Sequence, residues 1–342
     1  MNPSALKNIA ILRHGAIGDV INSLAMVKLL KNRYPQANIF YFTANYNREL
    51  LSYVPEINQV CEFEFSKRFF DGFRLSKNLK QKYHLPVFDL FINLQPNWCT
   101  RNLGFSIAKN FREYHKSSTK GKVIWQSFTD VAFQGQTKKK TEVEKSQFLS
   151  FPLIKLPPTI KDSTLKKIES LQSSRPKLAL IIGAGIDRPH KAWPTERWIQ
   201  FLQSFNQSIQ GWDILLVGAQ REETAVRQIQ EALPESNLIN LVNKLTLPET
   251  ASALELCKVA IGGDTGPMHL AASMGVRNIC LFGPTSEVKH RPLNGVALKS
   301  GFSCPLSCKL KKNVCSKASE ENCMNSITSE MLILELKNIL SV

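Results

Sequence analysis

The sequence predicts an α/β protein built from two doubly wound halves that face a cleft. Short apolar segments typical of buried parallel strands recur along the chain, and glycine-bearing turns follow them. Several of these turns lead into residues with apolar positions at helical spacing. The chain has 342 residues, more than a single hydrophobic core usually serves. We therefore expect two domains, each with a mostly parallel sheet and helices on both faces.

The first half begins with a strand over Ile9–Leu12, followed by a glycine turn and a helix. The apolar positions of that helix are Val20, Leu24, Val27 and Leu30. Pro35 lies just past the helix, "ANIFYFT" (37–43) reads as the next strand, and Phe88–Gln95 as a later one.

A proline-bearing polar stretch over 154–177 is interpreted as a linker with a short helix inside it. Strand, turn and helix then alternate again through "KLALIIGAG", "TERWIQFLQSF", "WDILLVGAQREETAVRQIQEAL", "KVAIGGDTGPMHLAASMG" and "RNICLFGPT". We place the first domain at residues 1–165 and the second at 166–342.

Composition narrows the function classes. The formal net charge of +16 indicates an acidic partner, which fits nucleic acid, anionic lipid or a phosphorylated substrate. No zinc-finger spacing or RNA-binding aromatic signature accompanies the basic clusters, so nucleic acid is the less favoured partner. No apolar run is long enough to span a membrane, and the N-terminus lacks the features of a secretory signal, so we expect a cytoplasmic protein.

Five glycine turns follow predicted strands: "HGAIGD", "GAGIDRPHK", "VGAQREE", "GGDTGPMH" and "FGPTSE". Ligands of doubly wound sheets bind beyond the carboxyl ends of the strands, where such turns meet helix N-termini. One such turn alone is ordinary turn chemistry, but five at equivalent positions predict a phosphate-bearing ligand.

At these residues the chain resembles glycosyltransferase family 9, the ADP-heptose:lipopolysaccharide heptosyltransferases. The similar segments are "ILRHGAIGDVINSLAMVKLLKNRYPQANI", "FDLFINLQ", "TEVEKSQFL", "HKAWPTERW" and "GGDTGPMHLAASMG" with "LFGPT". The resemblance implies the GT-B fold, with two Rossmann-like domains. It further implies that the N-terminal domain binds the acceptor and the C-terminal domain the nucleotide sugar.

The resemblance assigns two catalytic residues. Asp19 matches the family's catalytic aspartate, which would accept the proton of the acceptor hydroxyl. From the sequence alone, the favoured interpretation of Asp19 is an N-cap of a helix beginning at Val20, and the resemblance favours catalysis. Lys191 matches a family lysine placed against the phosphates; its alternative is an ordinary surface lysine.

Asp264, Thr265, Gly266 and His269 match the family's donor-binding turn. Backbone N–H groups, the glycine and the Thr265 hydroxyl would hold the diphosphate. Asp264 is assigned to sugar hydroxyls or to loop architecture, because a carboxylate repels phosphate. His269 either bonds locally or contacts phosphate.

Four further positions are assigned to the donor site. Gly18 and Gly185 lie on turns after strands, and Glu222 is placed at the ribose hydroxyls, with Glu223 as its alternative. Leu245 resembles the position that packs against adenine, and a plain core position is the alternative.

The chain departs from the family pattern in three places. "GAGIDRPHK" lacks the usual Ser or Thr, Asn93 replaces an Asp, and Thr141 replaces a His. The last two changes fall in the acceptor half and bear on the identity of the acceptor.

Four of the eight cysteines are clustered near the C-terminus: Cys304, Cys308, Cys315 and Cys323. Their spacing suits a structural metal site, two disulfides or a packed loop of reduced thiols, and a reducing cytoplasm argues against disulfides. The apolar surroundings of Cys61, Cys99, Cys257 and Cys280 predict core positions.

Taken together, the resemblance implies an inverting, metal-independent glycosyltransferase that moves heptose from ADP-heptose to a lipopolysaccharide-core acceptor. Such an enzyme would contact the inner face of the inner membrane peripherally, through its N-terminal half. Three alternatives stay open: a transferase with another sugar or acceptor, a dinucleotide-dependent oxidoreductase and an RNA-binding protein. Against the oxidoreductase, "HGAIGD" lacks the G-x-G-x-x-G spacing.

Overall fold

The computed structural model describes residues 6–64, 71–115, 121–134, 149–184, 189–302 and 323–341. The chain divides into two compact units, Met1–Lys155 and Leu156–Val342. The sequence places this division after residue 165. The earlier boundary arises because Lys155 N–H donates to Tyr53 O at 2.8 Å within the first unit, whereas α6 (Pro158–Lys167) packs on α9 (Leu247–Glu255) of the second.

The first unit contains a five-stranded sheet in the order β3-β2-β1-β4-β5, with every neighbouring pair parallel. Its strands are β1 (Asn8–Leu12), β2 (Asn38–Thr43), β3 (Gln59–Glu62), β4 (Leu90–Asn93) and β5 (Phe111–Glu113). The chain order reverses between β1 and β4, so the carboxyl ends of these two strands form a switch point, where doubly wound sheets bind ligands.

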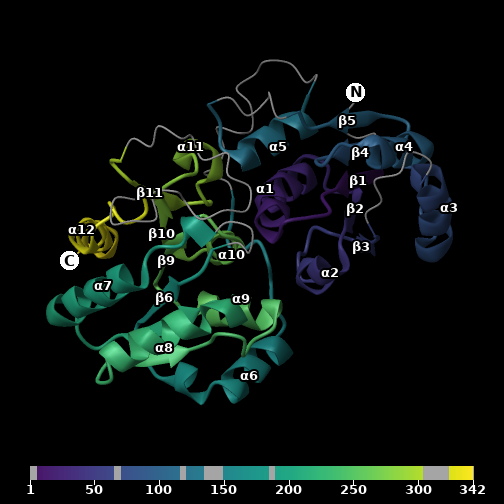
Figure 1. Ribbon diagram of the computed structural model, residues 1–342. Helices are drawn as coiled ribbons and strands as arrows, with labels where there is room; N and C mark the ends of the chain where they lie inside the picture. Colours follow the sequence, from purple (N-terminus) through teal and green to yellow (C-terminus); the bar gives the residue numbers. More distant parts are fainter. Residues whose placement is uncertain are drawn as a thin grey trace. The chain divides into compact units, whose positions relative to one another are not determined.

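Helices cover both faces of this sheet (Figure 1). They are α1 (Ile17–Arg33), α2 (Asn45–Ser52), α3 (Asp71–Tyr83), α4 (Trp98–Ile107) and α5 (Ile124–Ala132). The alternation of side chains along the strands sorts the two faces. Phe42 belongs to the core cluster of α3 and α4, whereas the hydroxyl of Tyr41 lies 2.6 Å from Ser23 Oγ of α1.

The second unit contains a six-stranded parallel sheet in the order β11-β10-β9-β6-β7-β8. Its strands are β6 (Lys177–Ile181), β7 (Asp213–Val217), β8 (Leu238–Asn240), β9 (Val259–Gly263), β10 (Arg277–Phe282) and β11 (Gly295–Lys299). This is the strand order of a Rossmann fold, and its switch point lies between β6 and β9.

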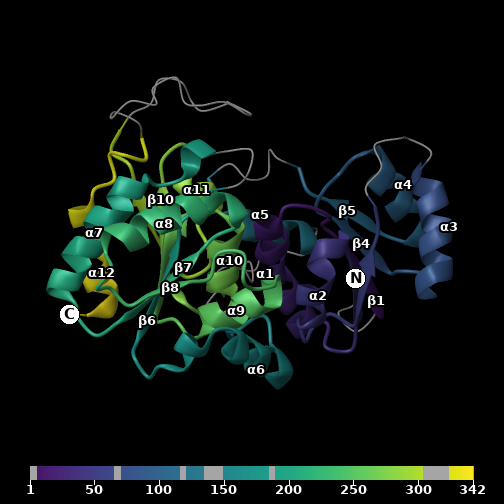
Figure 2. The same cartoon turned by 60° about the horizontal axis from the view of Figure 1, so that its bottom comes forward.

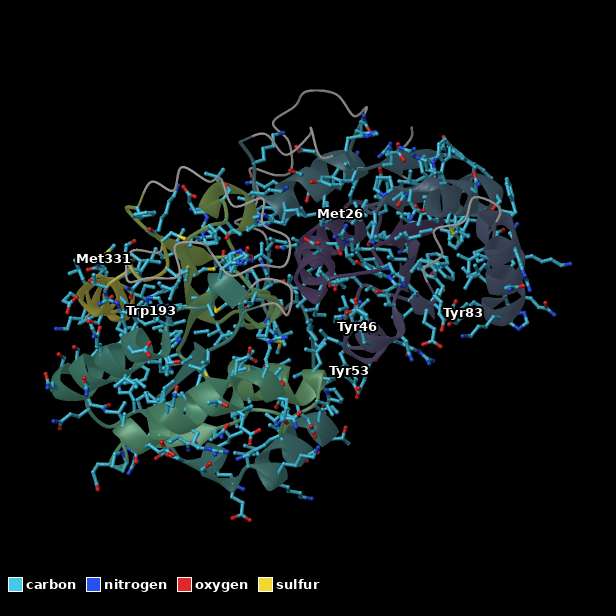
Figure 3. All side chains as sticks on the ribbon, viewed as in Figure 1. Met26, Tyr46, Tyr53, Tyr83, Trp193 and Met331 are labelled. Atoms are coloured by element: carbon cyan, nitrogen blue, oxygen red, sulfur yellow. The ribbon has the colours of Figure 1, made fainter. Side chains whose placement is uncertain are left out.

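The helices of the second unit are α6, α7 (Thr195–Ser208), α8 (Glu223–Ala232), α9, α10 (Gly266–Ser273), α11 (Glu287–His290) and α12 (Ser329–Leu340). Figure 2 shows α7 and α12 near each other at the end of this unit, and the two helices are in contact. The indole of Trp193, labelled in Figure 3, packs edge-on against that of Trp198, with 4.7 Å between the ring centroids. Its Nε1–H donates to Ile327 O at 3.0 Å. This contact fastens the segment before α12 to the core.

The structure confirms the predicted α/β class with two Rossmann-like sheets. None of the helices in the described part of the chain combines the length and hydropathy needed to cross a bilayer.

Candidate functional site

The structure brings four of the predicted donor-site residues and Lys191 together at the switch point of the second unit. Lys191 ends a 3-10 turn (Pro189–Lys191) that follows β6, and Asp264 and Thr265 follow the neighbouring strand β9. Gly266 and His269 belong to the first turns of α10. Because β6 and β9 are adjacent and parallel, their carboxyl ends place these groups side by side.

Lys191 is bound to Asp264 rather than exposed on the surface. Its Nζ donates to the backbone O and to Oδ2 of Asp264, both at 2.8 Å, and each of the two side chains is 10% exposed. The alternative of an ordinary surface lysine is therefore wrong. An ammonium has three protons, so one remains for a further acceptor such as a phosphate oxygen.

Asp264 is held in its charged form. Burial alone would raise its pKa, but the interaction with His269 and the charges of Lys191 and His290 outweigh this effect and hold the pKa far below its usual range. His269 Nε2 lies 3.6 Å from Asp264 Oδ1. Asp264 thus anchors the lysine and the histidine, which agrees with a role in loop architecture.

Two buried polar atoms at the start of α10 have no hydrogen-bond partner among the residues that the structure describes: Thr265 Oγ1 and His269 Nδ1. Thr265 is the N-cap residue of α10, yet its hydroxyl accepts no capping hydrogen bond from the helix. A buried hydroxyl without a partner is unfavourable, typically by about 1–3 kcal/mol. A ligand that supplies an acceptor there would remove this penalty, and the positive end of the helix dipole favours an anionic ligand.

Glycine is needed where β9 reaches this site. A Cβ on Gly263 would lie 3.1 Å from Lys191 O, and one on Gly262 would lie 2.9 Å from Ile181 O. The Gly-Gly pair before Asp264 therefore lets the turn after β6 approach β9 closely, which positions Lys191 against Asp264.

Glu222 lies at the end of a 3-10 turn (Gln220–Glu222) after β7, with its carboxylate engaged inside the protein. Oε2 accepts from Ala219 N–H at 2.8 Å, and Oε1 accepts from Arg221 Nε at 2.6 Å. Arg221 also donates to Ala184 O at 2.6 Å. The ribose assignment of Glu222 stays a prediction, in competition with this local role. Arg221 was not predicted from the sequence.

The remaining donor-site predictions lie in loops. Leu245 is half-buried in the segment between β8 and α9, and its contact with adenine stays a prediction. Gly185 lies outside the described residues, as do Asp187 and Arg188 of the same turn.

In the first unit, Asp19 lies in the first turn of α1 and forms an ion pair with Arg13. The helix begins at Ile17 and its N-cap residue is Ala16, so the alternative of Asp19 as the N-cap is wrong. The helix starts earlier than expected, directly after Ala16, whose φ is positive at 33°. Gly18 lies in the same helical turn.

Sequence reasoning missed the residues that support Asp19. Arg13 also donates to Leu94 O at 2.9 Å, which ties the turn after β1 to β4. Gln95 Oε1 accepts from the backbone N–H groups of His14 and Gly15 at 3.2 and 3.1 Å. The signal available was the position of Arg13 directly after one predicted strand and of Gln95 at the end of another. Tyr46, labelled in Figure 3, is exposed at the start of α2.

Asn93 is fully buried and structural in its contacts. Its Nδ2 donates to Thr100 Oγ1 at 3.0 Å, and its Oδ1 accepts from Gln95 N–H at 3.1 Å. These bonds shape the turn that presents Gln95. Thr141 lies outside the described residues.

Some of the cysteines considered in the sequence lie within the described residues, and others do not. Cys61, Cys99, Cys257 and Cys280 are buried, as expected of core positions. Burial raises the pKa of the Cys61 and Cys257 thiols to about 12, so both stay protonated. Cys304, Cys308 and Cys315 lie outside the described residues. The residues that the structure does describe contain no cluster of metal-ligating side chains.

Comparison with known proteins agrees with this arrangement. The family model for glycosyltransferase family 9 (heptosyltransferase) matches residues 73–319. The lipooligosaccharide heptosyltransferase 2 of Haemophilus influenzae is 26% identical over 319 residues, covering 85% of this chain and 87% of the relative. The lipopolysaccharide heptosyltransferase 2 of Escherichia coli K12 is 24% identical over 305 residues, covering 84% and 85%.

Two solved structures share the fold. A glycosyltransferase family 9 protein from Veillonella parvula superposes with a TM-score of 0.80 at 21% identity, covering 98% of this chain and 97% of its own. The ADP-heptose lipopolysaccharide heptosyltransferase II of E. coli superposes with a TM-score of 0.71 at 21% identity, covering 98% and 99%. These likenesses confirm the GT-B fold class. Because the family model spans well over half of its length, the chain belongs to glycosyltransferase family 9, the heptosyltransferase family, and is a glycosyltransferase.

Proposed function

We propose that this enzyme transfers heptose from ADP-heptose to a lipopolysaccharide-core acceptor with inversion at the anomeric carbon. The donor half of the proposal rests on the ion pair of Lys191 with Asp264, next to the hydroxyl of Thr265, at the switch point of the second unit. The names of the relatives, heptosyltransferases 2 of lipopolysaccharide and lipooligosaccharide, support heptose and its acceptor.

The second unit would bind the donor diphosphate. The unpartnered hydroxyl of Thr265, the remaining proton of the Lys191 ammonium and the N-terminus of α10 are three sources of positive potential or hydrogen bonds in one small region. Negative charge grows on the diphosphate as the sugar–phosphate bond breaks, so these groups stabilise the leaving group in the transition state.

The first unit would supply the base. The acceptor oxygen forms a bond to the anomeric carbon, the bond from that carbon to the diphosphate breaks, and ADP leaves with the electron pair. Asp19 accepts the proton of the attacking hydroxyl. Arg13 fixes the orientation of the Asp19 carboxylate, so we infer that Arg13 is a positioning residue.

The distribution of charge supports a phosphorylated acceptor and an anionic membrane surface as partners. Residues 1–155 contain 23 Lys and Arg against 11 Asp and Glu, which gives +12 of the formal net charge of +16. Peripheral contact with the inner face of the inner membrane, through this unit, is part of the proposal. No metal is required for transfer in this mechanism.

The donor assignment is tested by calorimetric titration with ADP, UDP, GDP and NAD. We expect selective binding of ADP, and a loss of affinity of about tenfold in Thr265→Val, because one hydrogen bond to a charged group is removed. Thr265→Ser, which keeps the hydroxyl, is the matched control and should bind as the wild type does. The double variant Lys191→Ala/Thr265→Ala should bind ADP more weakly still.

Preference for UDP or GDP would keep the transferase and replace the donor, which is the alternative of another nucleotide sugar. If Thr265→Val and Thr265→Ser bound ADP with equal affinity, the Thr265 hydroxyl would not contribute to ADP binding. Family membership favours a transferase over the oxidoreductase and RNA-binding alternatives.

A further inference from the structure

Large apolar side chains are exposed on α3 and α4 of the first unit. Phe73 of α3 is 55% exposed, and Trp98 and Phe105 of α4 are 62% and 63% exposed. Such side chains scattered singly need no explanation, but three aromatic rings on two adjacent helices form a patch.

The two helices pack closely enough to form one continuous surface. In Figures 1 and 2 α3 and α4 lie side by side on one face of the sheet, and they contact each other along their length. A Cβ on Gly72 would lie 2.5 Å from Cys99 O, so the helices approach each other most closely at their first turns. Near the other end, Lys80 Nζ donates to Ser106 O at 3.0 Å.

Helical spacing places the aromatic and basic residues on the outer side of this pair. Phe73, Lys77 and Lys80 follow an i, i+4, i+7 row on α3, and Trp98 and Phe105 are seven residues apart on α4. We call Phe73, Arg74, Lys77, Lys80, Trp98 and Phe105 the α3–α4 surface.

The α3–α4 surface carries basic side chains that form no ion pair within the part of the chain that the structure describes. Arg74 and Lys77 are exposed, and neither forms an ion pair with an acidic residue in the described parts of the chain. By contrast, Lys82 and Lys109 nearby are paired with Glu62 and Asp89. The sequence of α4 contains no acidic residue, and that of α3 contains none after Asp71.

Aromatic rings interleaved with unpaired basic side chains fit the interface of an anionic bilayer. The rings insert at the level of the headgroups, and the basic residues interact with the negative surface potential. A protein partner of ordinary interface composition would show fewer lysines, because lysine is depleted at such interfaces.

We propose that the α3–α4 surface docks this enzyme on a bilayer of anionic phospholipids. This inference deepens the proposed membrane contact and rests on it, but not on the transfer reaction. Docking would hold the first unit, where Asp19 lies, against the membrane that contains a lipid-linked acceptor.

The test is co-sedimentation of the full chain with vesicles made of equal parts phosphatidylglycerol and phosphatidylcholine, compared with phosphatidylcholine alone. We expect binding to the anionic vesicles only, and weaker binding as the salt concentration rises. Arg74→Glu/Lys77→Glu should bind at least about 25-fold more weakly, since each basic residue near such a surface is worth about fivefold. Phe73→Ser/Phe105→Ser should lose about tenfold.

Matched controls come from exposed residues of the second unit. Arg227→Glu/Lys258→Glu reverses two charges, and Val288→Ser/Leu334→Ser removes two exposed apolar side chains. Both should bind vesicles within about twofold of the wild type. Nucleotide titration of all four variants checks that the fold is intact and separates this proposal from the donor assignment.

Equal binding of neutral and anionic vesicles would overturn the proposal, as would α3–α4 variants that bind as the second-unit controls do. A dimer of the wild type that dissociates in the α3–α4 variants would identify a second copy of the chain as the occupant, which also overturns it. Loss of vesicle binding with full nucleotide binding is the expected pattern.

Discussion

Lys191 and Asp264 are 73 residues apart in the sequence, and their side chains meet at 2.8 Å with little exposure to solvent. An ion pair of this kind is costly to break from one side, because the remaining charge stays buried without its partner. The charge of Asp264 also affects Cys280: burial and this nearby charge raise the pKa of its fully buried thiol well above the usual value.

We expect Lys191→Met to lower the free energy of unfolding by about 3 kcal/mol, because Asp264 then lacks its main cation. In an Asp264→Asn background the same change should cost much less, since no buried carboxylate remains. Urea unfolding of the wild type, the two single variants and the double variant measures both costs. Equal costs in the two backgrounds would show that the pair is not coupled.

The glycine turn around Asp264 could be predicted from the sequence, but its ion pair with Lys191 could not. The Gly-Gly-Asp-Thr-Gly turn after an apolar strand is one of five such turns, and together they predict a phosphate-binding site. Nothing in the sequence near Lys191 indicates that Asp264 holds it, because that contact depends on which strands are neighbours in the sheet. The same holds for the ion pair of Arg13 with Asp19. Both residues lie near the predicted glycine turn, but the positive φ of Ala16 between them could not be predicted.

Among the elements, α6 and α9 are joined through one carboxylate. Glu249 of α9 accepts hydrogen bonds from Ser163 Oγ and Lys167 Nζ of α6, each at 2.9 Å. It also accepts from Thr246 N–H at 2.9 Å, which caps its own helix. Burial opposes its charge, but the bonds from Lys167, Thr246 and Ser163 prevail and lower the pKa of Glu249 to about 2.

This carboxylate should make the protein less stable in acid. Its pKa is depressed in the folded state, so its contribution is complete above the unfolded pKa near 4.5 and is lost as the pH falls toward about 2. Between about pH 6 and about pH 3, the stability advantage of the wild type over Glu249→Gln should shrink by about 2 kcal/mol. Urea unfolding of both proteins across this range measures it. A difference that stays constant with pH would contradict the assignment.

Helices and strands could be predicted where the sequence has a strong period. The strands β1, β2, β4, β6, β7, β9 and β10 all follow from short apolar segments before turns. The short edge strands β3, β5, β8 and β11 were not predicted, because they are three to five residues long and only partly buried. The helices α2 to α5 were not predicted either.

At the scale of the whole molecule, each unit has its own sheet and its own core. The excess of positive charge lies in the first unit, whereas the anchored lysine and the buried unpartnered threonine lie in the second. This distribution suits the roles proposed for the two units. A charged surface that meets phosphorylated or lipid partners needs exposure to solvent, whereas a diphosphate site needs fixed groups of low exposure.

The two-domain organisation was predictable because the strand–turn–helix rhythm restarts after a proline-bearing stretch. The position of the boundary was not, because it depends on which unit α6 packs against. The acceptor-binding and donor-binding labels of the two units follow from the resemblance to the family and stay predictions.

The most direct measurement is transfer itself. The enzyme would be incubated with ADP-heptose and a heptose-accepting lipopolysaccharide-core fragment, and the products followed by mass spectrometry and by release of ADP. We expect the acceptor to gain one heptosyl group for each ADP released, and Asp19→Asn to reduce the rate by about a hundredfold or more while ADP still binds. Transfer at the wild-type rate by Asp19→Asn, or no transfer from ADP-heptose by an enzyme that transfers from another nucleotide sugar, would contradict the account.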